Sequence, residues 1–189
     1  MIDPSISEPA AEWFEIKNVS SKNLDLNGLT VIGGTATEKF TVGKSVLCPP
    51  GAIVVFAASA DPKANGGITP AYVYTGSGFP LSNSAADAVE LQWKGLSIDK
   101  VAFTWGSNGW TKQAGASVQL SANKTDAVLN DSPASWCLSA TAWNGVDKGS
   151  PGKANGDCGT PPNGAPVPGS SPAPDGQKWL PAWFQGWAK

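Results

Sequence analysis

Two carboxylates stand three residues apart near the start of the chain, in the stretch E-W-F-E-I-K-N. On an α-helix, Glu12 and Glu15 would share a face, where one acid can donate a proton and the other can accept one. On a β-strand, side chains alternate between faces and each residue rises roughly 3.3 Å, so the two carboxyl groups would point apart, about 10 Å from each other along the chain. Their chemistry therefore depends on the element that carries them.

The sequence predicts a strand at this position. Phe14 and Ile16 alternate with the charged Glu15 and Lys17 at a period of two residues, and a polar turn cluster follows. We therefore expect Glu15 to face solvent beside Lys17, and Glu12 to mark the start of the strand. No catalytic residue is predicted.

The basic residues limit the chemistry further. All thirteen are lysines, so the chain has no arginine and no histidine, and its net charge is −2. Without histidine, the usual general base of nucleophilic triads and the commonest zinc ligand are missing. Without arginine, and with the lysines scattered singly, no nucleic-acid-binding surface is predicted. We expect a protein that is not an enzyme.

Short strands separated by turns account for most of the chain, which contains 22 glycines and 16 prolines. After the first strand, further strands are expected at residues 26–32, 40–42, 52–58, 71–74, 88–93, 98–105 and 117–120. The most apolar of these, 52–58, is expected to be a buried central strand, and a Lys94-Gly95 turn makes a hairpin of 88–93 and 98–105. No segment has helical periodicity, so the predicted fold class is all-β, as a sandwich.

Two tryptophans are candidates for ligand stacking. Trp105 and Trp110 flank the loop tip G-S-N-G, where indole rings could be exposed. Exposed rings can stack on sugars, although tryptophan in a small all-β domain more often packs in the core. Recognition of a glycan or another ligand by these residues is the alternative function.

Six aspartates fall in predicted loops and offer oxygen ligands of the kind that calcium prefers. They are Asp61, Asp87, Asp126, Asp131, Asp147 and Asp157. No D-x-[DN]-x-[DN]-G pattern groups them, and isolated loop aspartates mostly bond to their own backbone. No cofactor is predicted, and calcium is the one metal that the residues leave open.

The cysteines favour an oxidising compartment. Cys137 and Cys158 bracket a loop rich in glycine, serine and asparagine, outside any C-x-x-C pattern, and are expected to form a disulfide. Cys48 is then a buried thiol at a strand end, although a different pairing stays open. No run of about 18 apolar residues predicts a membrane span, and Met1-Ile-Asp-Pro is no secretory signal. We expect an extracytoplasmic protein, secreted or at the cell surface, whose signal peptide is absent from this chain.

Several stretches occur in an order that marks a family. They are E-W-F-E-I-K-N (12–18) with L-D-L-N-G-L-T-V (24–31), L-C-P-P-G-A-I-V-V-F-A (47–57), L-S-N-S-A-A-D-A-V-E-L (81–91), and S-P-A-S-W-C-L (132–138) with G-S-P-G-K-A-N (149–155). Together they resemble the lamin tail domain, in particular its secreted bacterial members. The resemblance implies an immunoglobulin-like β-sandwich over residues 1–158 that serves as a structural, adhesion or interaction module without catalytic residues.

One departure from the family bears on partners. Its members usually begin with a strand that precedes the segment resembling Met1-Ile-Asp-Pro, and this chain starts after that strand. Either the chain start clips the domain, or a tail or another subunit fills the place. An empty place would expose unpaired backbone groups along a sheet edge, which invites strand addition. We therefore expect protein partners, with self-association through this edge.

After Cys158 the composition changes. Residues 159–177 form a Pro/Gly-rich linker, and 178–189 form the aromatic tail K-W-L-P-A-W-F-Q-G-W-A-K. Either the tail is appended to the natural chain, or it docks on its own domain or on a neighbour. The expected anchors are Trp179, Trp183, Phe184 and Trp187. The most specific form of the self-association hypothesis is that subunits form a filament by exchanging a strand or the tail.

Overall fold

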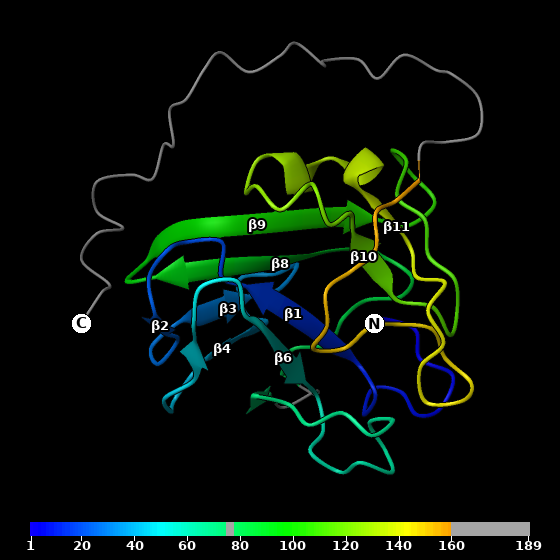
Figure 1. The fold of residues 1–189 in the computed structure, drawn as a ribbon, viewed down its shortest axis with the longest axis horizontal. Coiled ribbons are helices and arrows are strands. Elements are labelled where there is room, and N and C mark those ends of the chain that lie inside the picture. Colours follow the sequence, from blue (N-terminus) through cyan, green and yellow to red (C-terminus); the bar gives the residue numbers. More distant parts are fainter. Residues whose placement is uncertain (75–77, 160–189) are drawn as a thin grey trace. The chain divides into compact units, whose positions relative to one another are not determined.

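Strands make up most of the regular structure in the described residues, 1–74 and 78–159, of this computed structural model (Figure 1). The strands are β1 (Trp13–Lys17), β2 (Leu24–Asp25), β3 (Thr30–Ile32), β4 (Lys39–Thr41), β5 (Leu47–Cys48), β6 (Ile53–Ala57), β7 (Tyr72–Val73), β8 (Ala86–Trp93), β9 (Leu96–Thr104), β10 (Val118–Leu120) and β11 (Trp136–Leu138). The helices found in this part of the chain are two 3₁₀ turns, η1 (Leu129–Asp131) and η2 (Pro133–Ser135). The predicted all-β class is confirmed.

The first sheet has the order β1-β6-β7. β1 and β6 are antiparallel, with Phe14 opposite Phe56, and β7 runs parallel to β6. β6 is the central strand that its apolar sequence predicts, because Phe56 and Ala57 are completely buried in it. The sheet therefore begins at the strand that carries the opening motif.

The second sheet has the order β4-β3-β8-β9. The predicted hairpin of β8 and β9 is present, and Lys94 and Gly95 in its turn have φ values of 50° and 81°. Two such residues in succession match the twist of the flanking strands. One face carries the buried Val31 and Phe103, and the other carries polar side chains. This alternation is typical of an antiparallel sheet with one solvated face.

The two sheets meet at a cluster of aromatic rings. Phe40, from β4, lies with its ring centroid 6.3 Å from that of Phe56, from β6. The same ring is 5.5 Å from Tyr74 and 5.1 Å from Phe79, which are both buried. Because rings of both sheets share one core, the arrangement is consistent with a β-sandwich.

Two small sheets, β2-β5 and β10-β11, complete the fold. The strand predicted at 26–32 begins only at Thr30, because Gly28 adopts a φ of 90° in a turn that precedes it. β2, β5 and β11 are not predicted, although the equally short β4, β7 and β10 are. β2 and β5 adjoin the turn-forming residues Asn27-Gly28 and Pro49-Pro50-Gly51, which dominate the local pattern.

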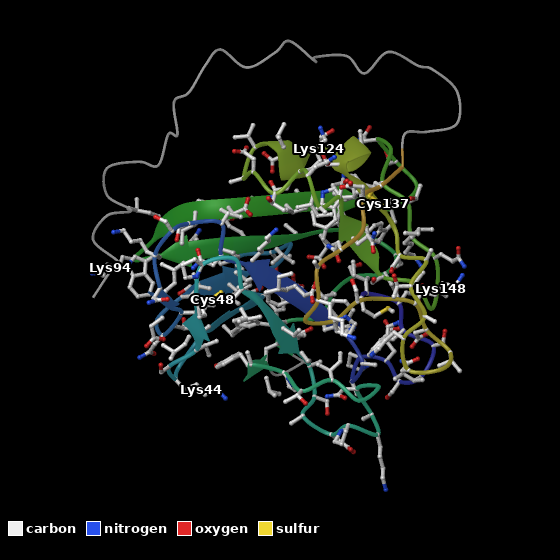
Figure 2. All side chains as sticks on the ribbon, viewed as in Figure 1. Lys44, Cys48, Lys94, Lys124, Cys137 and Lys148 are labelled. Carbon is white, nitrogen blue, oxygen red and sulfur yellow. A yellow bond between two sulfur atoms is a disulfide. The ribbon has the colours of Figure 1, made fainter. Side chains whose placement is uncertain are left out.

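The structure joins Cys137 to Cys158 in a disulfide, the expected pair. Cys48 is a buried thiol at the end of β5, and burial raises its pKa. Figure 2 labels both Cys48 and Cys137 among the strands. Residues Met1–Cys158 form one unit. The predicted linker beyond Gly159 and the tail, with its anchors Trp179, Trp183, Phe184 and Trp187, lie outside the described residues.

Candidate functional site

β1 is an edge strand, with β6 as its neighbour on one side. Asn18 N–H donates to the Ala52 carbonyl at 2.9 Å, so the even-numbered residues along β1 turn their backbone groups toward β6. In an antiparallel pair the backbone direction alternates from one residue to the next. The N–H and C=O groups of Trp13, Glu15 and Lys17 therefore point to the other side, which we call the open side of β1.

Met1 occupies the first place on the open side of β1. Its amino group donates to the Trp13 carbonyl at 2.7 Å, and its own carbonyl accepts from Trp13 N–H at 3.1 Å. Burial of this amino group lowers its pKa to about 5. Within residues 1–74 and 78–159, no backbone group pairs with Glu15 or Lys17 on that side. Among the described residues, Met1 is thus the one residue whose backbone pairs with the open side of β1.

The two carboxylates of the opening motif occupy different surroundings. Glu12 is only 2% exposed, and its Oε2 accepts from Leu81 N–H at 3.1 Å. Glu15 lies on the opposite face of the strand, where its Oε1 accepts from Gly152 N–H at 2.6 Å. The structure therefore does not bring the two acids together.

The expectation that Glu15 faces solvent is wrong. The segment that contains Gly149 and Gly152 folds over this face and leaves Glu15 half-buried. Burial raises the pKa of Glu12 and of Glu15 to about 7 each, although the bonds from Leu81 and Gly152 oppose the rise. Sequence reasoning misses this cover because it comes from the far end of the domain.

Trp13 anchors the start of the open side of β1. Its side chain is 4% exposed and packs with Met1, Val55 and Ala57 in a buried cluster. The Trp143 ring lies against it edge-on, with centroids 5.9 Å apart. The position of the edge is therefore fixed by packing on the face that also carries Glu15.

β9 is a second strand with an unpaired side. The hydrogen bond between Val42 N–H and the Leu29 carbonyl fixes which residues of β3 face β4. The same alternation, followed through β8 into β9, turns the backbone groups of Lys100 and Ala102 outward, while the register shift opposite Leu91 and Gln92 interrupts it at Ile98. No backbone partner for these groups is found in the described part of the chain. Here, however, η1 contacts the strand, and Figure 1 shows the two 3₁₀ turns beside β9 on the side away from β8.

A polar pair joins η1 to β9. Asn130 Nδ2 donates to Asp99 Oδ2 at 2.8 Å, whereas Oδ1 of each residue is buried without a hydrogen-bond partner among the described residues. Burial raises the pKa of Asp99, and the nearby charges of Asp131 and Asp126 add to the rise. The pair is 31 residues apart in the sequence, so no local pattern points to it.

Trp105 and Trp110 come together beside the loop at 106–109, with ring centroids 6.2 Å apart and planes at 87°. The expectation that both are exposed is wrong for Trp110, which is 7% exposed. Phe103 and Trp136 lie 6.1 and 5.9 Å from it, and β11 supplies the second of these rings. Trp105 is half-buried, and its Nε1 donates to the Ser82 carbonyl at 2.7 Å.

A shallow hollow of about 440 Å³ lies beside these rings, and we call it the Trp105 hollow. It is lined by Asn83, Ser84, Trp105, Gly106, Trp110, Thr111 and Lys112. Lys112 Nζ forms an ion pair with Asp3 Oδ2 at 2.6 Å. The hollow therefore combines an aromatic surface with short polar side chains and a neutralised charge.

Several of the aspartates that suggested calcium bond to backbone N–H groups. The expectation that all six lie in loops is wrong for Asp87, which is the second residue of β8. Asp87 accepts from Gly34 and Ala88 through Oδ1 and from Ser82 through Oδ2, each at 2.7 Å. Asp147 Oδ1 similarly accepts from the N–H of Ser5 at 3.0 Å. Among residues 1–74 and 78–159, no three His, Cys, Asp or Glu side chains gather closely enough to hold a metal ion.

In the described residues, no helix is long and apolar enough to cross a membrane. Comparison of the chain with protein-family models, with curated proteins and with solved structures gives no match. The two open strand edges and the Trp105 hollow are the candidate functional sites in the described residues.

Proposed function

We propose that this protein is a non-enzymatic structural or adhesion module that associates with copies of itself. The proposal takes the fold to be an immunoglobulin-like β-sandwich of the lamin tail kind, in keeping with the ordered sequence stretches. A disulfide between Cys137 and Cys158 suits a protein that works outside the reducing cytoplasm. The open side of β1 is the observation that carries the proposal.

The open side of β1 has the features that strand addition needs. The backbone groups of Glu15 and Lys17 lack partners within the described chain, and those of Trp13 are already paired with Met1 in the manner of a strand. A strand from a second copy can therefore continue where Met1 stops and extend the sheet. The bond from Gly152 N–H holds the Glu15 carboxylate on the face of the strand, away from the incoming backbone.

β9 is the less favourable edge for the same event. η1 lies against this strand, and its Asn130 is bonded to Asp99. Association through β1 is thus the specific form of the proposal.

The test measures molar mass by size-exclusion chromatography with light scattering, over a range of concentrations, for the full chain and for a chain that ends at Cys158. We expect the full chain to form oligomers. If the shorter chain forms the same oligomers, the edge alone suffices. If only the full chain assembles, the tail is the donor. Two monomers of constant mass would refute self-association.

The variant Lys17→Pro tests the edge itself. Proline removes one N–H group that points to the open side of β1 and leaves every bond to β6 in place. The matched control is Lys100→Pro, which likewise deletes a lysine and an outward N–H, but on β9. We expect Lys17→Pro to lower the average mass and Lys100→Pro to leave it unchanged, with circular dichroism as the check on folding. Equal masses for all three proteins would exclude the β1 edge.

A further inference from the structure

The Trp105 hollow points to a second activity that is independent of self-association. We propose that it binds a neutral carbohydrate, with the apolar face of one sugar ring stacked on the exposed part of the Trp105 indole. Three features carry this assignment: the way the ring is fixed, the polar groups around it, and the charge balance of the hollow.

The Trp105 ring is fixed before any ligand arrives. Its N–H is bonded to the Ser82 carbonyl, and Ser82 N–H is bonded in turn to Asp87 Oδ2 at 2.7 Å. The Phe103 ring packs against it with centroids 4.6 Å apart, and Trp110 abuts it edge-on. Because the only polar atom of the indole is already used, the ring offers a carbon surface, which suits the C–H face of a sugar.

Short polar side chains surround this surface. The hydroxyl groups of Ser84 and Thr111 make no hydrogen bond within the described residues, so both are available to sugar hydroxyls. Asn83 donates through Nδ2 to Glu8 Oε1 at 2.7 Å, which leaves its side-chain carbonyl as an acceptor. An aromatic surface with a few polar groups at its rim is the usual make-up of a small-molecule site.

The charge of the hollow favours an uncharged ligand. Its one lysine, Lys112, is paired with Asp3, and the Glu8 carboxylate lies next to Asn83. An acidic sugar would have to displace Asp3 from Lys112 and approach Glu8. The volume of about 440 Å³ is in the lower part of the range for ligand pockets, and the hollow is shallow. Both observations fit one or two sugar units of a longer neutral chain.

The test begins with an array of neutral and acidic oligosaccharides of two to six units, probed with the full chain. We expect neutral sugars to bind. Titration calorimetry with the best neutral sugar then compares the natural chain with Trp105→Ala, which is expected to bind about tenfold more weakly or worse. Binding of acidic sugars alone, or no binding at all, would overturn the assignment.

A double variant keeps the test decisive if Trp105→Ala disturbs the fold. Ser84→Ala with Thr111→Val removes two exposed hydroxyls of the hollow and no packing. The matched control, Ser21→Ala with Thr69→Val, removes two exposed hydroxyls elsewhere. We expect the first pair to weaken sugar binding several-fold and the control to leave it unchanged; equal affinities would refute the site. Lys17→Pro should bind sugar normally, which separates this inference from the proposed assembly.

Discussion

The two open strand edges differ in what lies beside them. Both leave outward backbone groups unpaired within the described residues, at Lys100 and Ala102 on β9 and at Glu15 and Lys17 on β1, yet η1 contacts β9 and bonds to it through Asn130 and Asp99. The open side of β1 instead has a single paired residue, Met1, at its start. Unpaired backbone groups alone therefore do not rank the two edges; the segments that lie beside them do.

The largest expected effect removes the anchor of β1. Trp13→Ala takes a 4% exposed ring out of the cluster with Met1 and Trp143, and should lower the free energy of unfolding by about 3–5 kcal/mol. The matched change on β9, Val101→Ala at a half-buried site, should cost about 1 kcal/mol. Urea denaturation measures both. Equal losses would show that the two edges depend on packing to the same degree.

Loss of the disulfide should have the next largest effect. Cys137→Ser with Cys158→Ser opens a loop with a sequence separation of 21 residues, which should cost about 3 kcal/mol. The same loop contains Gly152, which covers Glu15 beside β1. Hydrogen exchange should therefore speed up more at Gly152 than at Val101, whose N–H points toward β8. A uniform increase would mean that the disulfide holds both regions alike.

Two variants, one beside each open edge, should change the free energy of unfolding in opposite directions at neutral pH. Burial raises the pKa of Glu15 from 4.5 to about 7. Because the folded chain holds this proton more tightly than the unfolded chain, the free energy of unfolding falls as pH rises between these two values. Glu15→Gln should therefore gain roughly 1–2 kcal/mol relative to the natural chain between pH 5 and 8. The pKa of Glu90, beside β9, is lowered, mainly by its bond from Gln92. Glu90→Gln should lose stability at neutral pH and recover it in acid.

Urea denaturation at several pH values checks both variants. Burial lowers the pKa of the Met1 amino group to about 5, so this group makes the free energy of unfolding rise as pH increases toward 8. Its effect on stability is therefore opposite to that of Glu12 and Glu15 in the natural chain. The difference between each variant and the natural chain is therefore the informative quantity. Parallel pH profiles for Glu15→Gln and the natural chain would contradict the burial of that carboxyl.

The smallest effect is expected at the surface ion pair of the second sheet. Lys100 Nζ lies 3.3 Å from Glu90 Oε2, with the lysine side chain 53% exposed. Lys100→Gln should change the free energy of unfolding by about 0.5 kcal/mol or less, because water and salt screen such pairs. A larger loss would mean that the pair of Lys100 and Glu90 stabilises the second sheet more than an exposed ion pair usually does.

Period-two alternation is enough to predict the parts of the fold that repeat over five residues or more. It identifies β1, the central position of β6 and the β8-β9 hairpin, because each buries alternate or successive apolar residues. It does not identify β5, which runs directly into the turn at Pro49-Pro50-Gly51, or β11, which pairs with the distant β10. It also predicts that the strand of β3 starts at residue 26, whereas the positive φ of Gly28 places a turn there and the strand starts at Thr30.

The candidate sites are predictable only as far as local sequence determines them. Trp105 and Trp110 flank a loop as the glycines between them indicate, but the burial of Trp110 depends on Trp136, which comes from another strand. The opposite faces of Glu12 and Glu15 follow from the strand, whereas the cover over Glu15 depends on Gly152. Contacts between segments that are distant in the sequence determine how exposed Trp110 and Glu15 are, and the local sequence does not contain those contacts.

Cys48 gives the molecule a built-in reporter of local opening. It is the one cysteine outside the disulfide, it is fully buried, and its carbonyl accepts from Asn18 Nδ2 at 2.7 Å, at the end of β1. A thiol reagent can reach the sulfur only when this corner opens, so the labelling rate measures the opening free energy of the corner without an added label. A strand bound along β1 should slow the reaction. The rate therefore gives a readout of assembly in the unmodified protein.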